Sequence, residues 1–233
     1  MTSDIDLKPL EKRINIDFTA QDLLRQALTH RSYLNENPSF PLEHNERLEF
    51  LGDAVLELVV TDHLYETYKL PEGELTNLRA SIVRGDMLSR IAEELSLSDF
   101  MLLSRGERKD TGKARQYIMA NAVEALIGAI FLDSGYANAE KFVHSFIIVK
   151  LPEIVERGLH IDTKSRFQEL AQEKHRITPV YRVLSETGLD HAKEFTVGAF
   201  LENKKVGEGV GTSKQEAQQN AAKQALIFLE SSN

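Results

Sequence analysis

The sequence predicts two domains of different fold class: an all-α domain over residues 1–151 and a small α+β domain over residues 162–233, in the order α-β-β-β-α. Three observations predict this division. Apolar residues recur at helical spacing through the first part, without an alternating β pattern. The second part holds three short segments rich in β-branched and aromatic residues between two helical ones. Charge divides there too, because residues 161–233 hold 10 Lys and Arg against 10 Asp and Glu, so the net charge of −8 lies wholly in the first part.

The first domain is expected to contain five main helices. The first covers about residues 19–30, where Thr19 followed by Asp22 resembles a capping box. The second covers residues 44–68 and is broken by the turn at Pro71. Its apolar positions recur at helical spacing: Leu48, Leu51, Val55, Leu58 and Val59. The remaining helices are expected over about 74–95, 114–133 with Gly135 as its C-cap, and 137–151.

The second domain is expected to follow a short linker over residues 152–161, where Pro152 and Gly158 stand among charged neighbours. An amphipathic helix is predicted next, over residues 162–174. Strands are predicted where β-branched and aromatic residues are bounded by Gly or Asn, and an Ala-rich helix follows. These segments cover residues 180–186, 194–201 and 205–210 for the strands, and about 213–229 for the helix.

The composition narrows the class of protein. With 42% hydrophobic and 27% charged residues among 233, the chain fits a soluble globular protein rather than a disordered or collagen-like one. The absence of cysteine excludes disulfides, Cys-ligated zinc sites and a thiol nucleophile. The N-terminus lacks the apolar core of a signal peptide, and the longest apolar run, Ala125 to Leu132, is too short to span a bilayer. We therefore expect a cytoplasmic protein with no membrane partner.

Acidic residues recur along one stripe of the second predicted helix. Glu46, Glu49 and Asp53 are three and four residues apart, which places their side chains on the same face. Asn121 and Glu124 are three residues apart in a strongly apolar helix, where a lone buried carboxylate needs a partner or a metal ion. If the two helices cross, four of these groups form an all-oxygen set that suits Mg²⁺ or Mn²⁺: Glu49, Asp53, Asn121 and Glu124.

The same acids could instead form a solvated helix face paired with arginines. Against this, Leu48, Phe50 and Leu51 lie between the acids and make the helix apolar nearly all round. Spacing alone leaves both interpretations open.

Three segments of the first domain resemble the bacterial ribonuclease III family. They are Leu28–Tyr33 (LTHRSY), the signature block Asn45–Asp53 (NERLEFLGD) and Glu124–Ile130 (EALIGAI). The second domain resembles the double-stranded-RNA-binding domain that follows the nuclease domain in that family. The residues that carry this resemblance are Phe167–Leu170 (FQEL), Thr187–His191 (TGLDH), and Gly209–Ala217 (GVGTSKQEA) running into Ala221 and Ala222.

The resemblance implies a fold, an activity and partners. It implies an all-α endonuclease domain that acts as a homodimer on double-stranded RNA, with Mg²⁺ as cofactor and Mn²⁺ as a possible substitute. Water would hydrolyse phosphodiester bonds to leave 5′-phosphate and 3′-hydroxyl ends, in the processing of structured RNA such as ribosomal RNA precursors. The bound cation would activate the water and stabilise the leaving oxygen.

The resemblance also implies residue roles. Glu49, Asp53 and Glu124 match metal ligands, with Asn121 at the fourth ligand position, and Asp53 and Glu124 are thereby catalytic. Glu46 and Glu72 match acids that line the cleft near the scissile strand, and Phe50 matches an aromatic residue that inserts into the partner subunit.

Asn121 departs from the family, which usually has Asp there. The amide keeps a carbonyl oxygen for a cation but removes one negative charge, leaving −3 rather than −4 at the site. This predicts weaker metal binding. It leaves open a second function, a dimeric double-stranded-RNA-binding protein with weak or no cleavage. A third, more distant alternative is a helical scaffold whose acids form a charged face.

RNA contacts in the second domain are expected around the start of its last helix. Ser213 can cap this helix, and Lys214 at its N-terminus faces anionic phosphates. The family often has a second lysine where Gln215 stands. Further RNA contacts are expected from Gln168, reaching the shallow minor groove, and from His191 and Gln218. In the first domain, the basic run from Arg105 to Asp110 is expected to be a solvated loop that can touch RNA.

Overall fold

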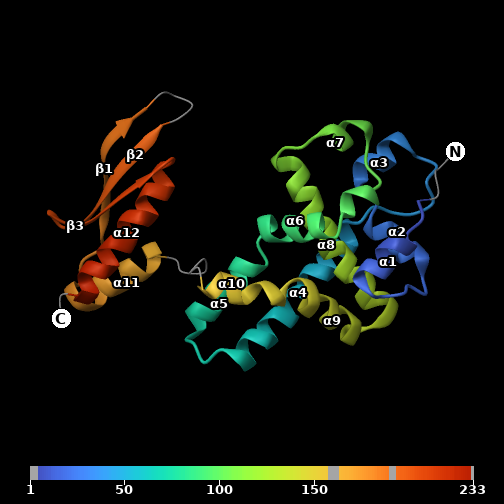
Figure 1. Ribbon diagram of the computed structural model, residues 1–233, viewed down its shortest axis with the longest axis horizontal. Helices are drawn as coiled ribbons and strands as arrows, with labels where there is room; N and C mark the ends of the chain where they lie inside the picture. The colour runs from blue at the N-terminus through green and yellow to red at the C-terminus, as the bar shows by residue number, and fades with distance from the viewer. Residues whose placement is uncertain (1–4, 157–162, 189–192, 232–233) are drawn as a thin grey trace. The chain divides into compact units, whose positions relative to one another are not determined.

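The computed structural model describes residues 5–156, 163–188 and 193–231, and the chain divides into two compact units, Met1–His160 and Ile161–Asn233. Figure 1 shows the helices of the first unit and the three strands of the second. The described helices of the first unit are α1 (Lys8–Ile14), α2 (Gln21–Ala27), α3 (Arg31–Glu36), α4 (Glu46–Thr67), α5 (Glu72–Ile82), α6 (Gly85–Glu94), the 3₁₀ turn η1 (Leu97–Asp99), α7 (Arg105–Lys109), α8 (Lys113–Ser134), α9 (Tyr136–Phe146), the 3₁₀ turn η2 (Ile148–Lys150) and α10 (Leu151–Glu156). The predicted all-α class is confirmed.

Helix α8 lies at the centre of the first unit and contacts α2, α4, α6 and α9 (Figure 1). Every residue from Met119 to Ile130 is buried except Asn121 and Glu124. By length and composition α8 could cross a membrane, but 61% of its most apolar stretch is buried inside this unit. The apolar character of α8 is therefore that of a core helix, and its two half-buried polar residues stand out as candidates for function.

Helices α4 and α8 cross with their backbones in close contact, because each has a glycine at the crossing. A Cβ on Gly52 would overlap the backbone carbonyl of Glu124, and a Cβ on Gly128 would overlap that of Leu48. Only residues without side chains allow this approach. The crossing therefore also fixes the positions of the residues that lie one turn away from each glycine along its helix.

Several predicted helix boundaries are wrong, each because of an interaction that spacing does not show. The helix expected over residues 74–95 is two helices, α5 and α6, separated at Arg84, whose backbone is extended with ψ of 144°. The Arg84 guanidinium donates to both carboxylate oxygens of Asp86 at 2.8 and 2.9 Å. The first part of the predicted linker, residues 152–156, belongs to α10, whose Ile154 is buried in the core of the first unit.

The capping box predicted at Thr19 and Asp22 is absent. Helix α2 begins at Gln21, and its N-cap residue Ala20 makes no side-chain hydrogen bond. The backbone N–H groups of Thr19 and Ala20 instead donate to the carboxylate of Asp133 at 3.2 and 2.7 Å. An acid at the end of α8 therefore supplies the acceptor that the start of α2 needs. The C-cap at Gly135 is confirmed, with φ of 83°.

The N-terminal helix α1 was not predicted, and it is fixed by a buried acid. Glu11 is 1% exposed and accepts hydrogen bonds from the Phe18 backbone N–H and the Gln21 side chain, both at 2.7 Å. Its other oxygen lies 2.8 Å from the Lys8 ammonium group. A buried carboxylate is tolerated here because these donors replace its water.

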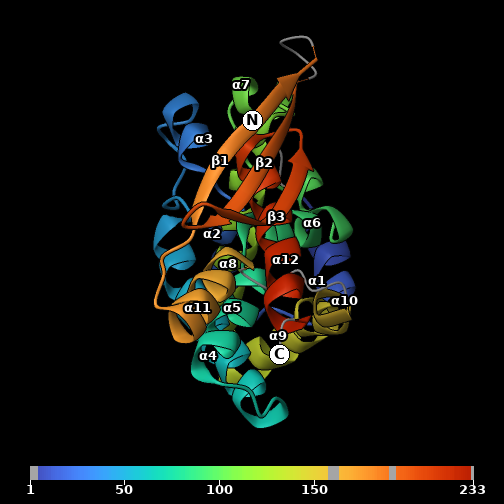
Figure 2. The same cartoon turned by 90° about the vertical axis from the view of Figure 1, so that its left-hand side faces the viewer.

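The second unit is a three-stranded antiparallel sheet with two helices on one face. Its elements are α11 (Thr163–His175), β1 (Val180–Thr187), β2 (Glu194–Leu201), β3 (Lys204–Gly211) and α12 (Lys214–Ser231), and the sheet order is β1-β2-β3. Figure 2 shows the strands side by side in this order. The predicted α-β-β-β-α order is confirmed, with strand ends within one residue of those expected.

Small residues join α12 to the sheet. Gly207, Gly209 and Gly211 of β3 lie against the backbone of α12 so closely that an added Cβ would meet it. The residues of α12 that face them are also small and fully buried: Ala217, Ala221 and Ala225. Ser213 caps α12 as predicted, accepting from the Glu216 N–H at 3.2 Å, while the Glu216 carboxylate accepts from the Thr212 N–H at 2.7 Å.

The crossing of α4 and α8 generates a stability prediction. Replacing Gly52→Ala should lower the free energy of unfolding by about 3 kcal/mol or more, since the added methyl group must separate two packed backbones. Urea unfolding followed by circular dichroism measures the change.

The matched control is Gly73→Ala on α5, where an added Cβ meets nothing within 4 Å. This change should be neutral or stabilise by up to about 1 kcal/mol, the helix propensity difference. Equal stability of the two variants would show that α4 and α8 do not depend on close backbone contact.

Candidate active site

The crossing of α4 and α8 brings the predicted metal ligands into one electrostatic group. Asn121 on α8 lies close enough to Glu49 on α4 for its side chain to lower the pKa of that carboxyl group. The negative charges of Asp53 and Glu49 act on Glu124, which lies one turn further along α8. The four residues proposed from sequence are therefore neighbours across the crossing, contributed two by each helix.

The acids are not drawn together as closely as a metal ion would require. Within the described residues, no three Asp, Glu or His side chains converge tightly enough to hold a cation as they stand. Like charges repel, and one of the four positions is occupied by an amide rather than an acid. The arrangement is that of neighbouring acids whose negative charges repel one another.

The charge state of these acids supports that view. Burial, together with the negative charges of Asp53 and Glu49, raises the pKa of Glu124 to about 7. Burial likewise raises the pKa of Glu49, against the lowering effect of the Asn121 side chain and with the charges of Glu46 and Asp53. Both pKa shifts indicate that the negative charge of these carboxylates is not balanced by a nearby positive charge.

Asn121 acts in this site in a way that an aspartate could not. Its amide N–H can donate a hydrogen bond to the Glu49 carboxylate, whereas an ionised carboxylate would repel it. The amide thus partly offsets the repulsion across the crossing. The all-oxygen set of three carboxylates and one amide fits a hard divalent cation, though with one charge fewer than four acids would provide.

The outer acids lie apart from this group. Glu46 is half-exposed and lies 3.5 Å from Arg31 and 3.9 Å from the His44 ring. Glu72, the first residue of α5, lines a hollow at the far end of α4 together with Tyr65 and Arg79. Within one chain the structure brings Glu46 beside Glu49, but it does not bring Glu72 to the carboxylate group.

Phe50 lies on an exposed apolar stripe of α4. Its side chain is 81% exposed, and Leu58 and Tyr65 on the same face are 57% and 72% exposed. Large apolar side chains this exposed on one helix face mark a surface for another molecule.

Lys214, predicted to contact RNA at the start of α12, has an acidic neighbour that was not predicted. The Lys214 ammonium group lies 2.9 Å from the Glu186 carboxylate of β1 and 5.4 Å from the centroid of the Phe195 ring of β2. The hydrogen bond from Lys214 lowers the pKa of Glu186. A phosphate that binds Lys214 must therefore compete with Glu186, a partner that the spacing of the motif did not reveal.

The other predicted RNA contacts differ in their surroundings. Gln215 and Gln168 are exposed on α12 and α11. Gln218 is half-buried and accepts a hydrogen bond from the Lys164 ammonium group at 2.9 Å, which joins the two helices. His191 lies outside the described residues.

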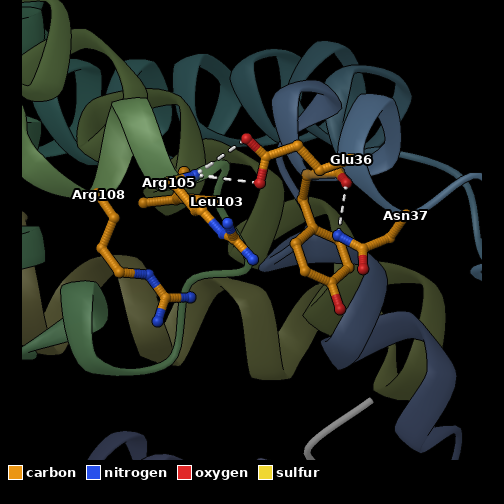
Figure 3. Close-up of a pocket in the computed structure, with 6 residues that line it drawn as sticks. Glu36, Asn37, Leu103, Arg105 and Arg108 are labelled. Carbon is orange, nitrogen blue, oxygen red and sulfur yellow. Dashed lines mark hydrogen bonds between the residues drawn. The ribbon is translucent and has the colours of Figure 1, made fainter. Parts of the chain in front are cut away.

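A basic hollow of about 620 Å³ lies between α3 and α7 (Figure 3). The segment expected to be a loop is the short helix α7, capped by the Ser104 hydroxyl, which accepts from the Glu107 N–H at 3.2 Å. Glu36 accepts from the Arg105 N–H at 3.2 and 3.3 Å, so its carboxylate is used in holding α7. Arg105 and Arg108 line the hollow and remain exposed, which suits contact with a polyanion.

Both units of the chain are similar to known protein families. A family model described as Ribonuclease-III-like matches residues 20–151, and a double-stranded RNA binding motif matches residues 163–229. Proteins named Ribonuclease 3 from Borreliella burgdorferi and Oceanobacillus iheyensis are 44% and 42% identical to this chain. These matches cover 95% and 98% of this chain, and 91% and 100% of the relatives.

A solved structure resembles the first unit. The nuclease domain of Ribonuclease III from Campylobacter jejuni is 39% identical, with a TM-score of 0.57. The match covers 63% of this chain and 99% of that domain. That structure is described as showing flexibility in a region involved in dimer formation.

The ion pair at the start of α12 generates a prediction for the RNA-binding motif. Glu186→Gln should raise the affinity for duplex RNA about two- to fivefold, the range expected when an exposed pair is released. The reason is that Lys214 no longer has to leave a carboxylate to meet a phosphate. Fluorescence anisotropy with a labelled duplex measures the change, without divalent metal so that no cleavage occurs.

The control is Glu202→Gln on the turn between β2 and β3, which alters the net charge equally but lies apart from Lys214. It should change affinity less than Glu186→Gln. If both variants gain equally, general charge rather than competition for Lys214 explains the effect.

Proposed function

Since the chain belongs to the ribonuclease III family of endoribonucleases acting on double-stranded RNA, we propose that its cleavage depends on a divalent cation held by Glu49, Asp53, Asn121 and Glu124. Mg²⁺ is the proposed cofactor, and Mn²⁺ can replace it. The observation that carries the proposal is Glu124, half-buried on a core helix, with a pKa raised to about 7 by its burial and by two negative neighbours. A cation bound between α4 and α8 would offset the negative charge of this half-buried carboxylate and its two acidic neighbours.

The proposed reaction is hydrolysis of a phosphodiester bond to give 5′-phosphate and 3′-hydroxyl ends. The cation, when bound, would lower the pKa of a water molecule and polarise the phosphate. The carboxylates of Glu49, Asp53 and Glu124 would bind it, and Glu124 would release its proton as they do so, because a ligating carboxyl group must be ionised. Asn121 would hold Glu49 in position through its amide.

The similarity to proteins named Ribonuclease 3 over nearly the whole chain favours this proposal over a binding protein without cleavage. The same family membership excludes the third alternative, a helical scaffold with a merely charged face. Asn121 is the member of the proposed ligand set that is not a carboxylate. With one charge fewer at the ligand set, the metal affinity of the chain should be lower than with an aspartate.

A homodimer is proposed from the exposed stripe of Phe50, Leu58 and Tyr65. Two copies related by a twofold axis would cover the same stripe on each other. With the two α4 helices antiparallel, the end of one helix near Glu72 would lie beside the start of the other. This arrangement would bring an acid that is remote within one chain to the carboxylate group of the second chain.

The second unit is proposed to hold the duplex by its phosphates and minor groove, through α11 and the start of α12. Structured precursors such as those of ribosomal RNA are the proposed substrates. The exposed Arg105 and Arg108 would add phosphate contacts on the nuclease unit.

The proposal for the metal ligands is tested by restoring the missing charge. Asn121→Asp should lower the Mg²⁺ concentration needed for half-maximal cleavage by about tenfold or more, because loss of even an outer-shell partner of a metal costs about that much. A Mg²⁺ titration of both proteins on one duplex, read on a denaturing gel, measures the shift.

Two controls frame this experiment. Asn35→Asp, an exposed site on α3 with the same gain of charge, should leave the titration unchanged. Glu124→Gln should abolish cleavage while duplex binding persists. Superimposable curves for the parent and Asn121→Asp would remove position 121 from the metal site, and cleavage by Glu124→Gln near the parent rate would contradict the proposed ligand set.

The dimer is tested on its most exposed aromatic residue. Phe50→Glu should give a folded monomer at micromolar concentration, since burial of an unpaired charge and loss of a large apolar contact together cost at least about 2 kcal/mol per copy. Sedimentation equilibrium gives the mass. Leu132→Glu is the control, because Leu132 is 53% exposed on α8, outside the stripe. A Phe50→Glu protein that remains dimeric would place the interface elsewhere.

A further inference from the structure

Two histidines from different helices lie in ring contact, away from the carboxylate group. His63 belongs to the second half of α4 and His144 to the last turn of α9. Their ring centroids are 5.2 Å apart and their planes are inclined at 81°. His63 is half-buried and His144 is exposed, so the pair is open to solvent on one side.

The surroundings of this pair are acidic. Asp62 and Glu66 on α4 both act electrostatically on His63. Glu140, one turn before His144 on α9, acts on Tyr136, as Asp62 does. Negative charges from both helices therefore surround the edge of the α4–α9 contact, where they favour a cation.

The distance between the two ring centroids fits a shared metal ion. A tetrahedral ion bound by one nitrogen of each ring at about 2.0–2.1 Å would hold the two centroids about 5 Å apart. Each ring offers a nitrogen that binds a metal ion when the imidazole is neutral.

We propose that His63 and His144 form a two-histidine clip for a borderline transition-metal ion such as Zn²⁺, which ties α4 to α9. Within the described residues no third Asp, Glu or His completes the set at ligand distance, so water fills the remaining positions and the acids act from outside. Imidazole selects such ions over Mg²⁺, which prefers oxygen. The clip is therefore independent of the proposed catalytic metal, although both sites share α4.

The test is Zn²⁺ binding to the full-length protein in excess Mg²⁺, so that the carboxylate group is occupied. Isothermal titration at a temperature where the protein is folded should detect Zn²⁺ binding by the parent. His144→Gln should lose at least about tenfold in Zn²⁺ affinity, as expected when a direct ligand is removed. His144 is exposed near the end of a helix, so this variant should fold normally.

His175→Gln on α11 is the matched control, an exposed histidine remote in sequence, and should bind Zn²⁺ as the parent does. A second readout is thermal unfolding, where Zn²⁺ should raise the midpoint of the parent but not that of His144→Gln. Absence of Zn²⁺ binding by the parent, or equal binding by His144→Gln, would overturn the clip and leave the two rings as a packing contact. Neither result would bear on the duplex cleavage proposed above.

Discussion

The contact between the backbones of α4 and α8 is the constraint on which the first unit depends. Gly52 and Gly128 remove the side chains that would otherwise keep the two helices apart. One turn from that contact, α4 presents Glu49 and α8 presents Glu124, so the position of the acids is set by the packing of the core. A site built in this way is positioned by two long helices rather than by loops.

At this site the requirements of folding stability and of function oppose each other. An acid with a pKa raised to about 7 on a core helix is destabilising when ionised, and the fold carries it because the surrounding apolar residues of α8 are fully buried. The Asn121 amide relieves part of the repulsion at Glu49. If the four residues bind a cation as proposed, this amide would favour the metal-free protein at the expense of the affinity for the cation, and an aspartate would have the opposite effect.

Much of the fold and the site could be predicted from local patterns. The spacing of apolar residues predicted α4 and α8 within two residues at each end, and β-branched and aromatic residues bounded by Gly or Asn predicted all three strands. Interactions between distant segments could not be predicted. Asp133 caps a helix 113 residues earlier in the chain, and Glu186 meets Lys214 across the sheet. The residue spacing around Asp133 or Glu186 does not indicate which distant group each acid contacts. The contact between the histidines of α4 and α9 could not be predicted for the same reason.

The glycines of β3 have a consequence for the order in which the second unit folds. Gly207, Gly209 and Gly211 contribute no side chain to pair with β2, and each loses more backbone entropy on ordering than another residue would, by roughly 0.5–1 kcal/mol. The strand is thus weak on its own and becomes favourable only when the alanines of α12 close over it. Strand and helix should form together in a single cooperative step, so the folding of β3 depends on α12.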